Sequence, residues 1–398
     1  MLSLGFILSI VAVGIWTYLL LFRGFFWRET PHAAPDVALD SWPEVVVVTP
    51  ARNEADVVGQ SMAALLAQDY PGTIHIVLVD DDSTDGTAAA AEGAAAKSKS
   101  HHKLSVVRNA ALAPGWTGKL WAVNRGLSEA ERLAPDAKYV LLTDADILHE
   151  RTSLRQLVSK AEQGGLKMVS LMARLKTETL AERALIPAYI FYFQKLYPFS
   201  WVRDPGNKAA GAAGGCMLVD RAALQAIGGI AAIRSALIDD CALGKAIKTQ
   251  GPIFLGLADG VASLRGYPRW ADVWMLIARA AFTQLGFSAA MLLVSTLMML
   301  ATYVMPLALV LFAEGPARLL GAVAFVAMVF AYQPTLRYHR LSALWALAMP
   351  LVASFYTIAT IDSGLRYWSG RGGQWKGRMQ AQGMSSVGMN TGGAEGDA

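Results

Sequence analysis

Hydrophobic residues form two kinds of pattern in this chain. Long uninterrupted apolar stretches lie near both ends. Between them, short apolar runs alternate with segments whose apolar residues recur at helical spacing. Four stretches contain no Asp, Glu, Lys or Arg, namely residues 2–22, 285–312, 319–336 and 341–361. Each is long enough for a helix to cross about 30 Å of hydrocarbon. The pattern predicts an N-terminal transmembrane anchor (residues 1–22), C-terminal interfacial and transmembrane helices (271–362) and a water-facing domain between them (40–270).

Within the central region, β-branched segments alternate with segments whose apolar residues recur at helical spacing. The predicted strands are residues 45–48, 74–79, 104–107 and 139–142, and the predicted helices are 55–68, 88–96 and 122–133. This alternation predicts an α/β domain with a mainly parallel sheet. Ligands of such sheets bind at the carboxyl ends of the strands, and acidic residues follow two of the predicted strands.

The charge distribution changes what the net charge of +4 implies. Residues 23–284 hold 28 basic and 27 acidic residues, whereas the region after them holds seven basic and four acidic ones. The excess therefore surrounds the C-terminal apolar stretches, where basic residues commonly flank membrane helices, and nucleic-acid binding is disfavoured. The two cysteines, Cys216 and Cys241, form no CxxC motif, so neither a disulfide framework nor a zinc site is predicted.

The first apolar stretch has two readings, a cleaved signal peptide or an uncleaved anchor. Its start carries no charge, and the basic residues Arg23 and Arg28 follow it, which favours an anchor with the central domain in the cytoplasm. The C-terminal side is less simple, because basic residues flank the last stretch at both ends. A re-entrant stretch, or a bend of residues 285–312 into two short passes, would reconcile these flanks. Residues 363–398 are predicted to be a basic and then disordered tail.

Two acidic clusters carry the candidate chemistry. Asp144 and Asp146 alternate at a strand end, which places two oxygen ligands on one side and suits Mg²⁺ or Mn²⁺; the competing reading is a solvated turn that caps the next helix. Asp80 and Asp81 follow a buried strand directly, where a carboxylate can accept from a uracil N–H or from ribose hydroxyls. The residues after them, 82–85, are expected to shape the turn. Neither GxGxxG after the first strand nor a P-loop motif is present.

Taken in order, these motifs resemble those of the family 2 glycosyltransferases. The matching segments are Thr49-Pro50-Ala51-Arg52-Asn53-Glu54, Val79-Asp80-Asp81-Asp82-Ser83-Thr84-Asp85-Gly86-Thr87, Gly118-Lys119 with Asn124, Asp144-Ala145-Asp146, Gly214-Gly215-Cys216 and Ile238-Asp239-Asp240. The resemblance implies a GT-A fold, a nucleotide-sugar donor (UDP by default), a divalent metal and a cytosolic catalytic domain on the bacterial inner membrane.

The resemblance also implies roles for individual residues. Asp240 is the expected catalytic base, and Asp239 beside it replaces a glutamate of the family pattern. The metal ligands are Asp144 and Asp146. The expected donor-binding residues are Pro50, Arg52, Asn53, Glu54, Asp80, Asp81, Lys119, Asn124, Asp144, Gly214, Gly215 and Arg279. Only Arg279 remains of the arginine–tryptophan motif of processive synthases, which favours transfer of a single sugar. The resemblance separately implies that the transfer inverts the anomeric configuration. The alternative role of Arg279 is anchoring at the membrane interface.

The acceptor is expected to be a lipid hydroxyl. Residues 185–201 are rich in aromatic side chains, which suit a surface at headgroup level or, alternatively, packing between the domain and the membrane helices. The whole chain resembles the hopanoid-biosynthesis-associated glycosyltransferases of the family, and ceramide-type and carotenoid-type enzymes have similar layouts. A polyprenyl-phosphate acceptor would use Arg265, Arg269 and Arg279. An inactive membrane scaffold is disfavoured because the carboxylates of Asp144, Asp146 and Asp240 are retained. A nucleotidyltransferase would also use paired carboxylates for a metal, but the segments around Gly214 and Asp239 do not support that function.

Overall fold

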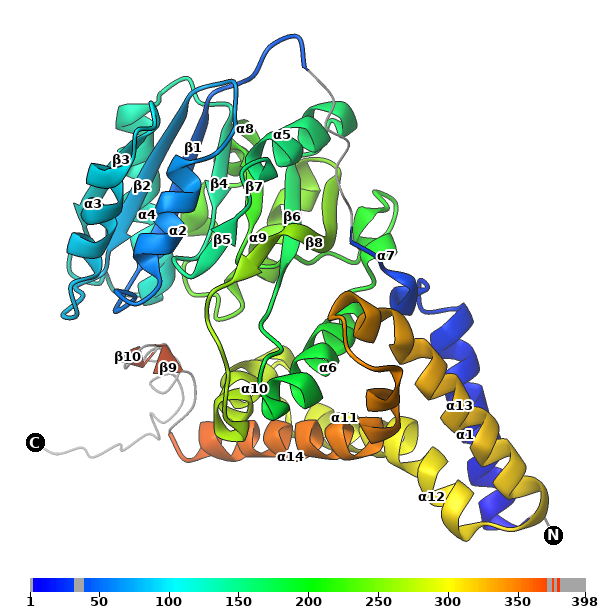
Figure 1. Ribbon diagram of the computed structural model, residues 1–398. Helices are drawn as coiled ribbons and strands as arrows, with labels where there is room; N and C mark the ends of the chain where they lie inside the picture. Colours follow the sequence, from blue (N-terminus) through cyan, green and yellow to red (C-terminus); the bar gives the residue numbers. More distant parts are fainter. Residues whose placement is uncertain (1–2, 32–38, 371–373, 376–377, 380–398) are drawn as a thin grey trace, which may run out of the picture.

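An α/β domain and a group of helices below and beside it make up the structure (Figure 1). The computed structural model describes residues 3–31, 39–370, 374–375 and 378–379. The helix α1 (Leu4–Leu21) belongs to the helical part, and the chain then enters the α/β domain, leaves it once through α6 (Leu180–Leu196) and leaves it finally through α10 (Trp270–Gln284). The predicted tail of residues 363–398 is helical up to Trp368, and the part of it predicted to be disordered lies outside the described residues.

The α/β domain is built on an eight-stranded sheet. The strands are Val45–Ala51 (β1), Ile74–Asp80 (β2), Lys103–Arg108 (β3), Tyr139–Leu142 (β4), Ile147–His149 (β5), Met168–Arg174 (β6), Met217–Asp220 (β7) and Ile253–Ser263 (β8). Their order is β3-β2-β1-β4-β7-β6-β8-β5. The four strands predicted from the sequence are confirmed, with β4 matching at both ends.

The sheet is mixed, and four of its seven strand pairings are parallel, so the expectation of a mainly parallel sheet is correct; β6 and β8 form the fourth parallel pair. Strands β3, β2, β1 and β4 run parallel to one another. Strand β7 pairs antiparallel with both β4 and β6, and β5 pairs antiparallel with β8. β7 runs antiparallel to its neighbours because it follows the excursion through α6 rather than a strand–helix–strand crossover, which parallel neighbours require.

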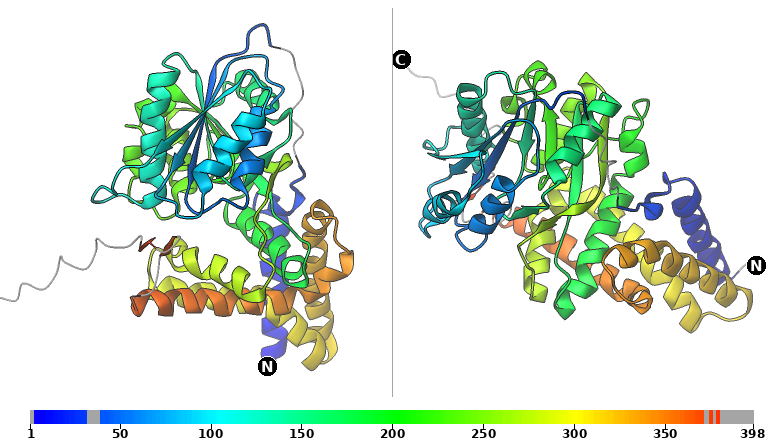
Figure 2. Two further views of the ribbon diagram at one scale, coloured as in Figure 1. Left: turned by 60° about the vertical axis from the view of Figure 1, so that its left-hand side comes forward. Right: turned by 45° about the horizontal axis from the view of Figure 1, so that its top comes forward.

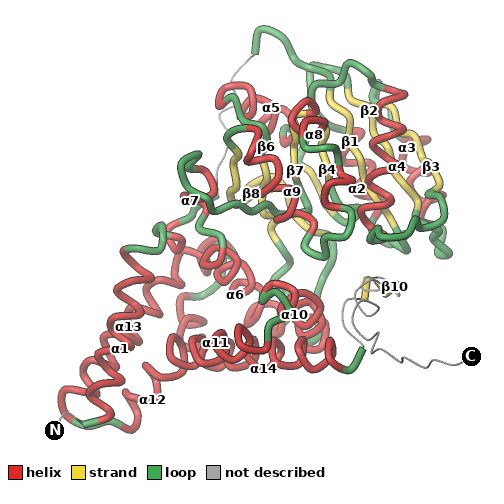
Figure 3. The backbone as a smooth tube through the Cα atoms, turned by 180° about the vertical axis from the view of Figure 1, so that it is seen from behind, coloured by secondary structure: helices red, strands yellow, loops and turns green. Residues whose placement is uncertain are grey.

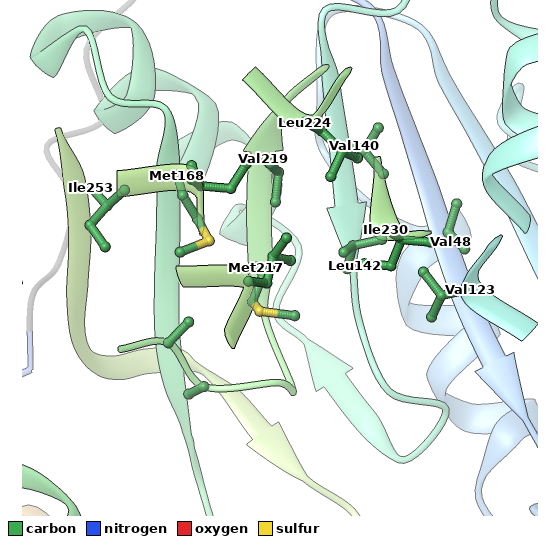
Figure 4. Packing of buried hydrophobic residues seen from close by; sticks show 14 of the residues in the cluster. Val48, Val123, Val140, Leu142, Met168, Met217, Val219, Leu224, Ile230 and Ile253 are labelled. Carbon is green, nitrogen blue, oxygen red and sulfur yellow. The ribbon is translucent and has the colours of Figure 1, made fainter. Parts of the chain in front are cut away.

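Helices cover both faces of the sheet. Packed on one face are α2 (Val58–Leu66), α3 (Thr87–Lys97) and α5 (Ser153–Gly164), and on the other α4 (Gly118–Leu133), α8 (Arg221–Ala226) and α9 (Asp239–Ile247). Val46 and Val48 of β1 enter the second core, shown in part in Figure 4, whereas Val45 and Val47 enter the first. Burial on both faces explains why the strands read as continuous apolar segments rather than as an alternation.

Gly126 allows α4 to lie close to the sheet. A Cβ atom at this position would stand 2.9 Å from a methyl carbon of Val79 and closer still to Val48. We therefore expect Gly126→Ala to lower the free energy of unfolding by about 1–3 kcal/mol through overpacking. Gly93→Ala in α3 is the matched control, because a Cβ there meets nothing within 4 Å, and it should raise stability by about 0.5–1 kcal/mol. Thermal unfolding of the detergent-solubilised variants measures both, and equal midpoints would contradict the close approach.

The aromatic segment around α6 packs against other helices, so the structure favours the packing alternative over a headgroup-level surface. Phe191 is fully buried and contacts Phe26 and Tyr332. The ring of Tyr192 lies 5.4 Å from that of Tyr303 and 4.9 Å from that of Tyr356. These aromatic pairs join the α/β domain's excursion to the apolar helices and form a third core.

Four helical segments are long and apolar enough to cross a membrane. They are Leu4–Leu21, Ala289–Phe312, Gly315–Tyr338 and Ala343–Trp368. The second is α11 (Ala289–Met299) and α12 (Met305–Phe312), joined by a π-helical turn (Leu300–Val304); the third is α13 (Gly315–Tyr338), and the fourth contains α14 (Met349–Trp368). α1 and α13 lie side by side, and α12 packs against α13. The predicted N-terminal anchor and the three C-terminal apolar stretches thus all form helices.

These four segments do not share one direction. α14 runs across the axis of α1 and α13, beneath the α/β domain, as Figures 1 and 2 show, and α11 packs along α14. The π-helical turn therefore bends the second segment, so that α11 follows α14 and α12 follows α13 (Figure 3). Side chains exposed on α14 recur seven residues apart, at Leu351, Ile358 and Leu365, while Ala353, Tyr356 and Ala359 on the other side are buried.

Candidate active site

A cavity of about 510 Å³ lies between the carboxyl edge of the sheet and helix α10. Pro50 at the end of β1 and Asp144 after β4 line it from the sheet, and Arg279 lines it from α10. The other lining residues are Glu54, Thr117, Lys119, Ala145, Asp146, Tyr189, Ala236, Leu237, Ile238, Asp239, Asp240, Arg265, Tyr267, Asp272, Met275, Leu276 and Ala280. Carboxylates and apolar side chains thus face one another across the same space.

Two helices begin at this cavity and bring charged side chains to it. Lys119 lies in the first turn of α4, whose N-cap Thr117 accepts a hydrogen bond from the backbone N–H of Leu120. Asp239 and Asp240 form the first turn of α9. Because backbone N–H groups at a helix start favour negative charge, both termini are suited to carboxylates or to an anionic ligand.

Lys119 lies at the centre of the acidic cluster. Its Nζ lies 2.9 Å from Oδ1 of Asp144 and 3.1 Å from Oδ2 of Asp239. Burial alone would lower the pKa of Lys119, but Asp144 and Asp239 raise it well above its ordinary value. The side chain therefore remains a cation and links the β4 end to the α9 start. Asp144 and Asp239, which are 95 positions apart along the chain, are thus joined through one ammonium group.

Asp240 has the electrostatic character of a general base. Its Oδ2 accepts a hydrogen bond from the backbone N–H of Gly214 at 3.0 Å, and its Oδ1 accepts one from that of Cys241 at 2.7 Å. Burial and the neighbouring charge of Asp239 raise the pKa of Asp240 to about 6, while Lys119 opposes the shift. A carboxylate with a pKa just below neutrality is mostly ionised at pH 7 and still a usefully strong base.

Arg265 is a residue whose place the sequence did not reveal. Its Nε lies 2.9 Å from Oδ2 of Asp146, and its guanidinium donates to both carboxylate oxygens of Glu54 at 2.6 and 2.7 Å. Arg265 follows β8, which pairs with β5 next to Asp146, so strand pairing alone brings these residues together. Of the three arginines that a polyprenyl-phosphate acceptor would use, Arg265 and Arg279 line the cavity, whereas Arg269 is exposed and paired with Asp272.

The carboxylate oxygens of Asp144 and Asp146 are ligands of the kind that hard divalent cations prefer. Burial and the charge of Asp146 raise the pKa of Asp144, against the opposing charge of Lys119, so added positive charge would be favourable here. Among the described residues, no group of three or more His, Cys, Asp and Glu is arranged to hold an ion by itself. Two carboxylates complemented by water and substrate phosphate fit Mg²⁺ or Mn²⁺, which rarely use an all-protein cage.

The second acidic cluster lies at the same sheet edge but does not line this cavity. Oδ1 of Asp81 accepts from Nδ2 of Asn109 at 2.8 Å, and a guanidinium nitrogen of Arg52 lies 3.6 Å from its Oδ2. Oδ1 of Asp80 accepts from the backbone N–H of Ser83 at 3.1 Å. Asn53 adopts a left-handed conformation (φ 50°), and its side-chain oxygen accepts from the N–H of Thr84. These residues shape a rim beside the cavity.

The turn after β2 has the structural role expected from the sequence. Oδ1 of Asp85 accepts from the backbone N–H and the hydroxyl of Thr87, and its Oδ2 accepts from the N–H of Ala55. Asp82 adopts a left-handed conformation (φ 59°), which aspartate tolerates better than most residues. The turn thus ties the start of α3 to the segment after β1.

Among the remaining predicted donor-binding residues, Gly214 lines an adjoining pocket, whereas Gly215 and Asn124 do not line either space. A Cβ atom on Gly214 would stand 3.4 Å from Nζ of Lys119 and 3.5 Å from Oδ2 of Asp240. At Gly215 the added atom would meet the side chain of Ile147 at 3.0 Å. Gly214 therefore leaves room for the charged cluster, and Gly215 leaves room for packing.

The side of the cavity that faces the helical part carries residues that the sequence did not assign to the site. Tyr189 reaches it from α6, Tyr267 from the segment after β8, and Met275 and Leu276 from α10. Burial raises the pKa of Tyr189 to about 12, so its hydroxyl stays protonated. The only sequence signals for this side were the aromatic density of residues 185–201 and the apolar spacing of residues 270–284.

Comparison with known proteins finds a family match within the α/β domain. Residues 46–228 match the family described as Glycosyl transferase family 2. Over 137 residues the chain is 34% identical to the beta-monoglucosyldiacylglycerol synthase of Synechocystis sp.; the alignment covers 33% of this chain and 26% of that protein. The matched segment therefore spans about a quarter of that relative.

A solved structure shares the fold over most of the chain. It is the mannosyltransferase PcManGT from Pyrobaculum calidifontis in complex with GDP-Man and Mn²⁺, with a TM-score of 0.54 and 20% sequence identity, covering 90% of this chain and 99% of that one. Residues 46–228 thus match a glycosyltransferase family 2 model, and the chain shares the Rossmann-like GT-A fold. The expected fold is confirmed, with helices compatible with membrane anchors at both ends.

Proposed function

We propose that this chain, whose residues 46–228 match glycosyltransferase family 2, is a membrane-bound inverting enzyme that transfers one sugar from a nucleotide sugar, with UDP as the proposed nucleotide, to a lipid hydroxyl. The observation that carries the proposal is the position of the acidic cluster. Asp144, Asp239 and Asp240 surround Lys119 in a cavity whose opposite wall is helix α10. That wall presents apolar side chains, Met275, Leu276 and Ala280, next to the charged Asp272 and Arg279. A site of this form brings a polar donor and an apolar acceptor to one place.

The proposed reaction is a single displacement with Asp240 as general base. An oxygen of Asp240 takes the proton of the acceptor hydroxyl while the hydroxyl oxygen attacks the anomeric carbon and the bond to the nucleoside diphosphate breaks. Attack from the face opposite the leaving group inverts the configuration. Asp239 holds Lys119 at 3.1 Å, which keeps a cation near the leaving diphosphate, and Arg279 on α10 supplies a second one on the other wall.

The donor is proposed to lie along the sheet edge, between the two acidic clusters. Asp80 and Asp81 with Arg52 and Asn53 form the rim suited to a base and ribose. Pro50 and Glu54 lie between this rim and the charged cluster, since both line the cavity. Gly214 leaves space beside Lys119 for the sugar. Gly215 and Asn124 are proposed to support this arrangement without contacting the donor.

A divalent metal, Mg²⁺ or Mn²⁺, is proposed at Asp144 and Asp146. When bound, the ion offsets negative charge on the leaving diphosphate. Each carboxylate is paired with its own cation, Asp144 with Lys119 and Asp146 with Arg265. The two cations offset part of the repulsion between these neighbouring carboxylates, which would receive the ion together with the donor.

Metal removal gives a direct test of this site. We expect EDTA to abolish sugar transfer and Mn²⁺ or Mg²⁺ to restore it, because hard cations require oxygen ligands and bind reversibly. Asp146→Asn should raise the Mn²⁺ concentration needed for half-maximal rate by about tenfold or more. Asp136→Asn, far from the cavity lining, serves as the control. Full activity in EDTA that does not change when metal is added would exclude the metal assignment.

The acceptor is proposed to enter from the membrane side. Tyr189, Met275 and Leu276 present aromatic and apolar surface to the cavity, and α10 contacts α14 and α6 in the helical part. The curated relative from Synechocystis is named as a synthase of a glucosylated diacylglycerol, which supports a lipid hydroxyl as the acceptor. Within this class, a triterpenoid of the hopanoid type is the proposed acceptor, on the resemblance of the whole chain.

The arrangement of the helices supports a topology in the bacterial inner membrane. We propose that α1 and α13 cross the bilayer, that α12 descends beside α13, and that α11 and α14 lie in the membrane plane under the catalytic domain. Arg23 follows α1, and Arg337 lies in the last turn of α13, both at the ends nearest that domain, where the hydroxyl of Tyr338 donates to the backbone oxygen of Ala258 in β8. Arg23, Arg28, Arg337, Arg340 and Arg366 then lie on the cytosolic side, and Arg318 lies at the opposite end of α13. The excess of basic residues on the cytosolic side accords with the positive-inside rule.

This topology places the C-terminus in the cytosol. Green fluorescent protein fused after residue 398 should therefore fluoresce, and alkaline phosphatase fused there should be inactive, because each folds on one side of the membrane only. A fusion after Glu314, at the start of α13, should give the reverse pattern. Active phosphatase at the C-terminus would show that α14 crosses the membrane, contrary to the proposal.

The single most informative experiment combines donor and acceptor. Membranes containing the protein are incubated with a panel of radiolabelled nucleotide sugars, and the lipid extract is separated and identified by mass spectrometry. The expected result is one labelled lipid carrying one sugar on a hydroxyl. Label on a lipid phosphate would point instead to a polyprenyl-phosphate acceptor, and no labelled lipid with any donor would overturn the proposal.

A further inference from the structure

A second cavity, of about 490 Å³, lies among the apolar helices and shares no lining residue with the active-site cavity. Its walls come from α1, the C-terminal end of α6, and α11 with the following π-helical turn. Tyr18 and Leu19 line it from α1, and Met298 and Met299 line it from α11. Two cations, Arg23 and Lys195, line one end. An apolar cavity with a cationic end is the subject of this inference.

Arg23 and Lys195 are held close together at this end. Nε of Arg23 donates to the backbone oxygen of Lys195 at 3.1 Å, and the guanidinium lies 4.8 Å from the ring centre of Trp201. Nζ of Lys195 donates to the hydroxyl of Tyr303 at 2.9 Å. In the part of the chain that the structure describes, no ion pair joins either cation to a carboxylate. The positive charge of this end is therefore not balanced by the protein residues described.

Such a pair is electrostatically costly without an anion. Burial and the charge of Arg23 lower the pKa of Lys195 to about 8, which reflects the unfavourable transfer of an ammonium group away from water beside another cation. Buried charges in proteins are ordinarily paired. An anionic group between Arg23 and Lys195 would supply the missing partner and would restore the pKa of the lysine.

The position of the cavity indicates where this anion comes from. Arg23 lies two residues beyond the end of α1, a candidate membrane span, so the cationic end is at the level where a bilayer's headgroups meet its hydrocarbon. Apart from Ser295 and Thr302, the remaining walls are aliphatic, aromatic and thioether side chains, mainly from α1 and α11. A soluble phosphate would match only the cationic end, whereas a lipid matches both ends of the cavity.

We propose that this cavity binds one anionic phospholipid, with its phosphodiester at Arg23 and Lys195 and an acyl chain against Tyr18 and Met298. A zwitterionic phospholipid is discriminated against because its ammonium group would approach the same two cations. The site is separate from the sugar-transfer site. It depends on the membrane placement of α1 but not on the reaction, so a binding measurement tests it whether or not the proposed activity is found.

The experiment uses the full chain in detergent micelles and native mass spectrometry. Phosphatidylglycerol and phosphatidylcholine with the same acyl chains are titrated separately, and the fraction of protein that retains one lipid is measured. We expect at least about tenfold tighter retention of phosphatidylglycerol. Arg23→Gln/Lys195→Gln should abolish this preference, and Lys195→Arg should keep it. Arg318→Gln is the matched control, since Arg318 also donates to a backbone carbonyl beside a candidate span.

Further arms keep the proposal falsifiable. Met298→Trp fills the cavity and keeps both cations, so it should lose phosphatidylglycerol even if the double variant does not fold. Millimolar inorganic phosphate should not displace the lipid; displacement at that concentration would indicate a free-anion site and overturn the proposal. Equal retention of both lipids by the parent protein, or an unchanged preference in the folded double variant, would also overturn it.

Discussion

Asp240→Asn is expected to lower the rate of sugar transfer by about 10²–10⁴-fold, the usual contribution of a general base, while leaving donor binding intact. Asparagine keeps the size of the side chain and retains an oxygen to accept from the backbone N–H of Gly214 or Cys241. It lacks the carboxylate that takes the acceptor proton. The transfer rate is measured with radiolabelled donor, and donor affinity is measured by calorimetry on the same protein.

The pH profile separates this catalytic role from a structural one. With a pKa of about 6 for Asp240, the parent enzyme's kcat/KM should rise as the pH increases through 6, because only the ionised carboxylate accepts a proton. Asp240→Asn should lose this dependence. Asp259→Asn, an exposed aspartate of β8 outside the cavity lining, is the control and should behave like the parent. Parent-level transfer by folded Asp240→Asn would show that another group is the base.

Lys119→Met is expected to reduce transfer by about 10²–10³-fold, comparable with removing one preorganised electrostatic group from a transition state. The variant leaves Asp144 and Asp239 without the cation that lies 2.9 and 3.1 Å from them. Two consequences follow. The leaving diphosphate loses a nearby positive charge, and the acidic cluster repels itself more strongly, which also lowers the free energy of unfolding.

The second consequence has a distinctive signature. Lys119 lowers the pKa of Asp240 against burial and Asp239, so removing it should move the acidic limb of the pH profile above 6. Lys138→Met is the matched control, because Lys138 pairs with Glu162 at 2.6 Å but is about half exposed and outside the cavity. A folded Lys119→Met enzyme with an unchanged acidic limb would contradict the coupling between Lys119 and Asp240.

Much of the α/β domain is predictable from local sequence because its strands are buried on both faces. The run Val45–Val48 and the run Tyr139–Leu142 read as strands on hydrophobicity alone, and both are strands. The second half of the sheet is not predictable in the same way. The antiparallel position of β7 between β4 and β6 depends on contacts between segments far apart in the chain, and no periodicity within β7 encodes its neighbours.

The candidate site likewise contains residues that are recognisable from local sequence and contacts that depend on the tertiary structure. Asp144 and Asp146 are recognisable because they end a buried strand, and their place at the sheet edge follows from that strand. The ion pairs that hold them are not recognisable. Arg265 reaches Asp146 only because β8 pairs with β5, and Asn124 lies outside the cavity although it shares α4 with Lys119, since a helix directs successive side chains to different sides.

The sequence by itself determined which segments are apolar helices, which are buried strands, and which acids end those strands, because each of these properties depends on neighbouring residues. Only the tertiary structure decided how the helices point and which charges meet. Hydropathy gives the length of residues 341–361 but not their direction; α14 lies across α1 and α13 because its buried side chains pack on α10 and α11. The pairing of Lys119 with Asp239 likewise depends on the sheet, which brings the starts of α4 and α9 together.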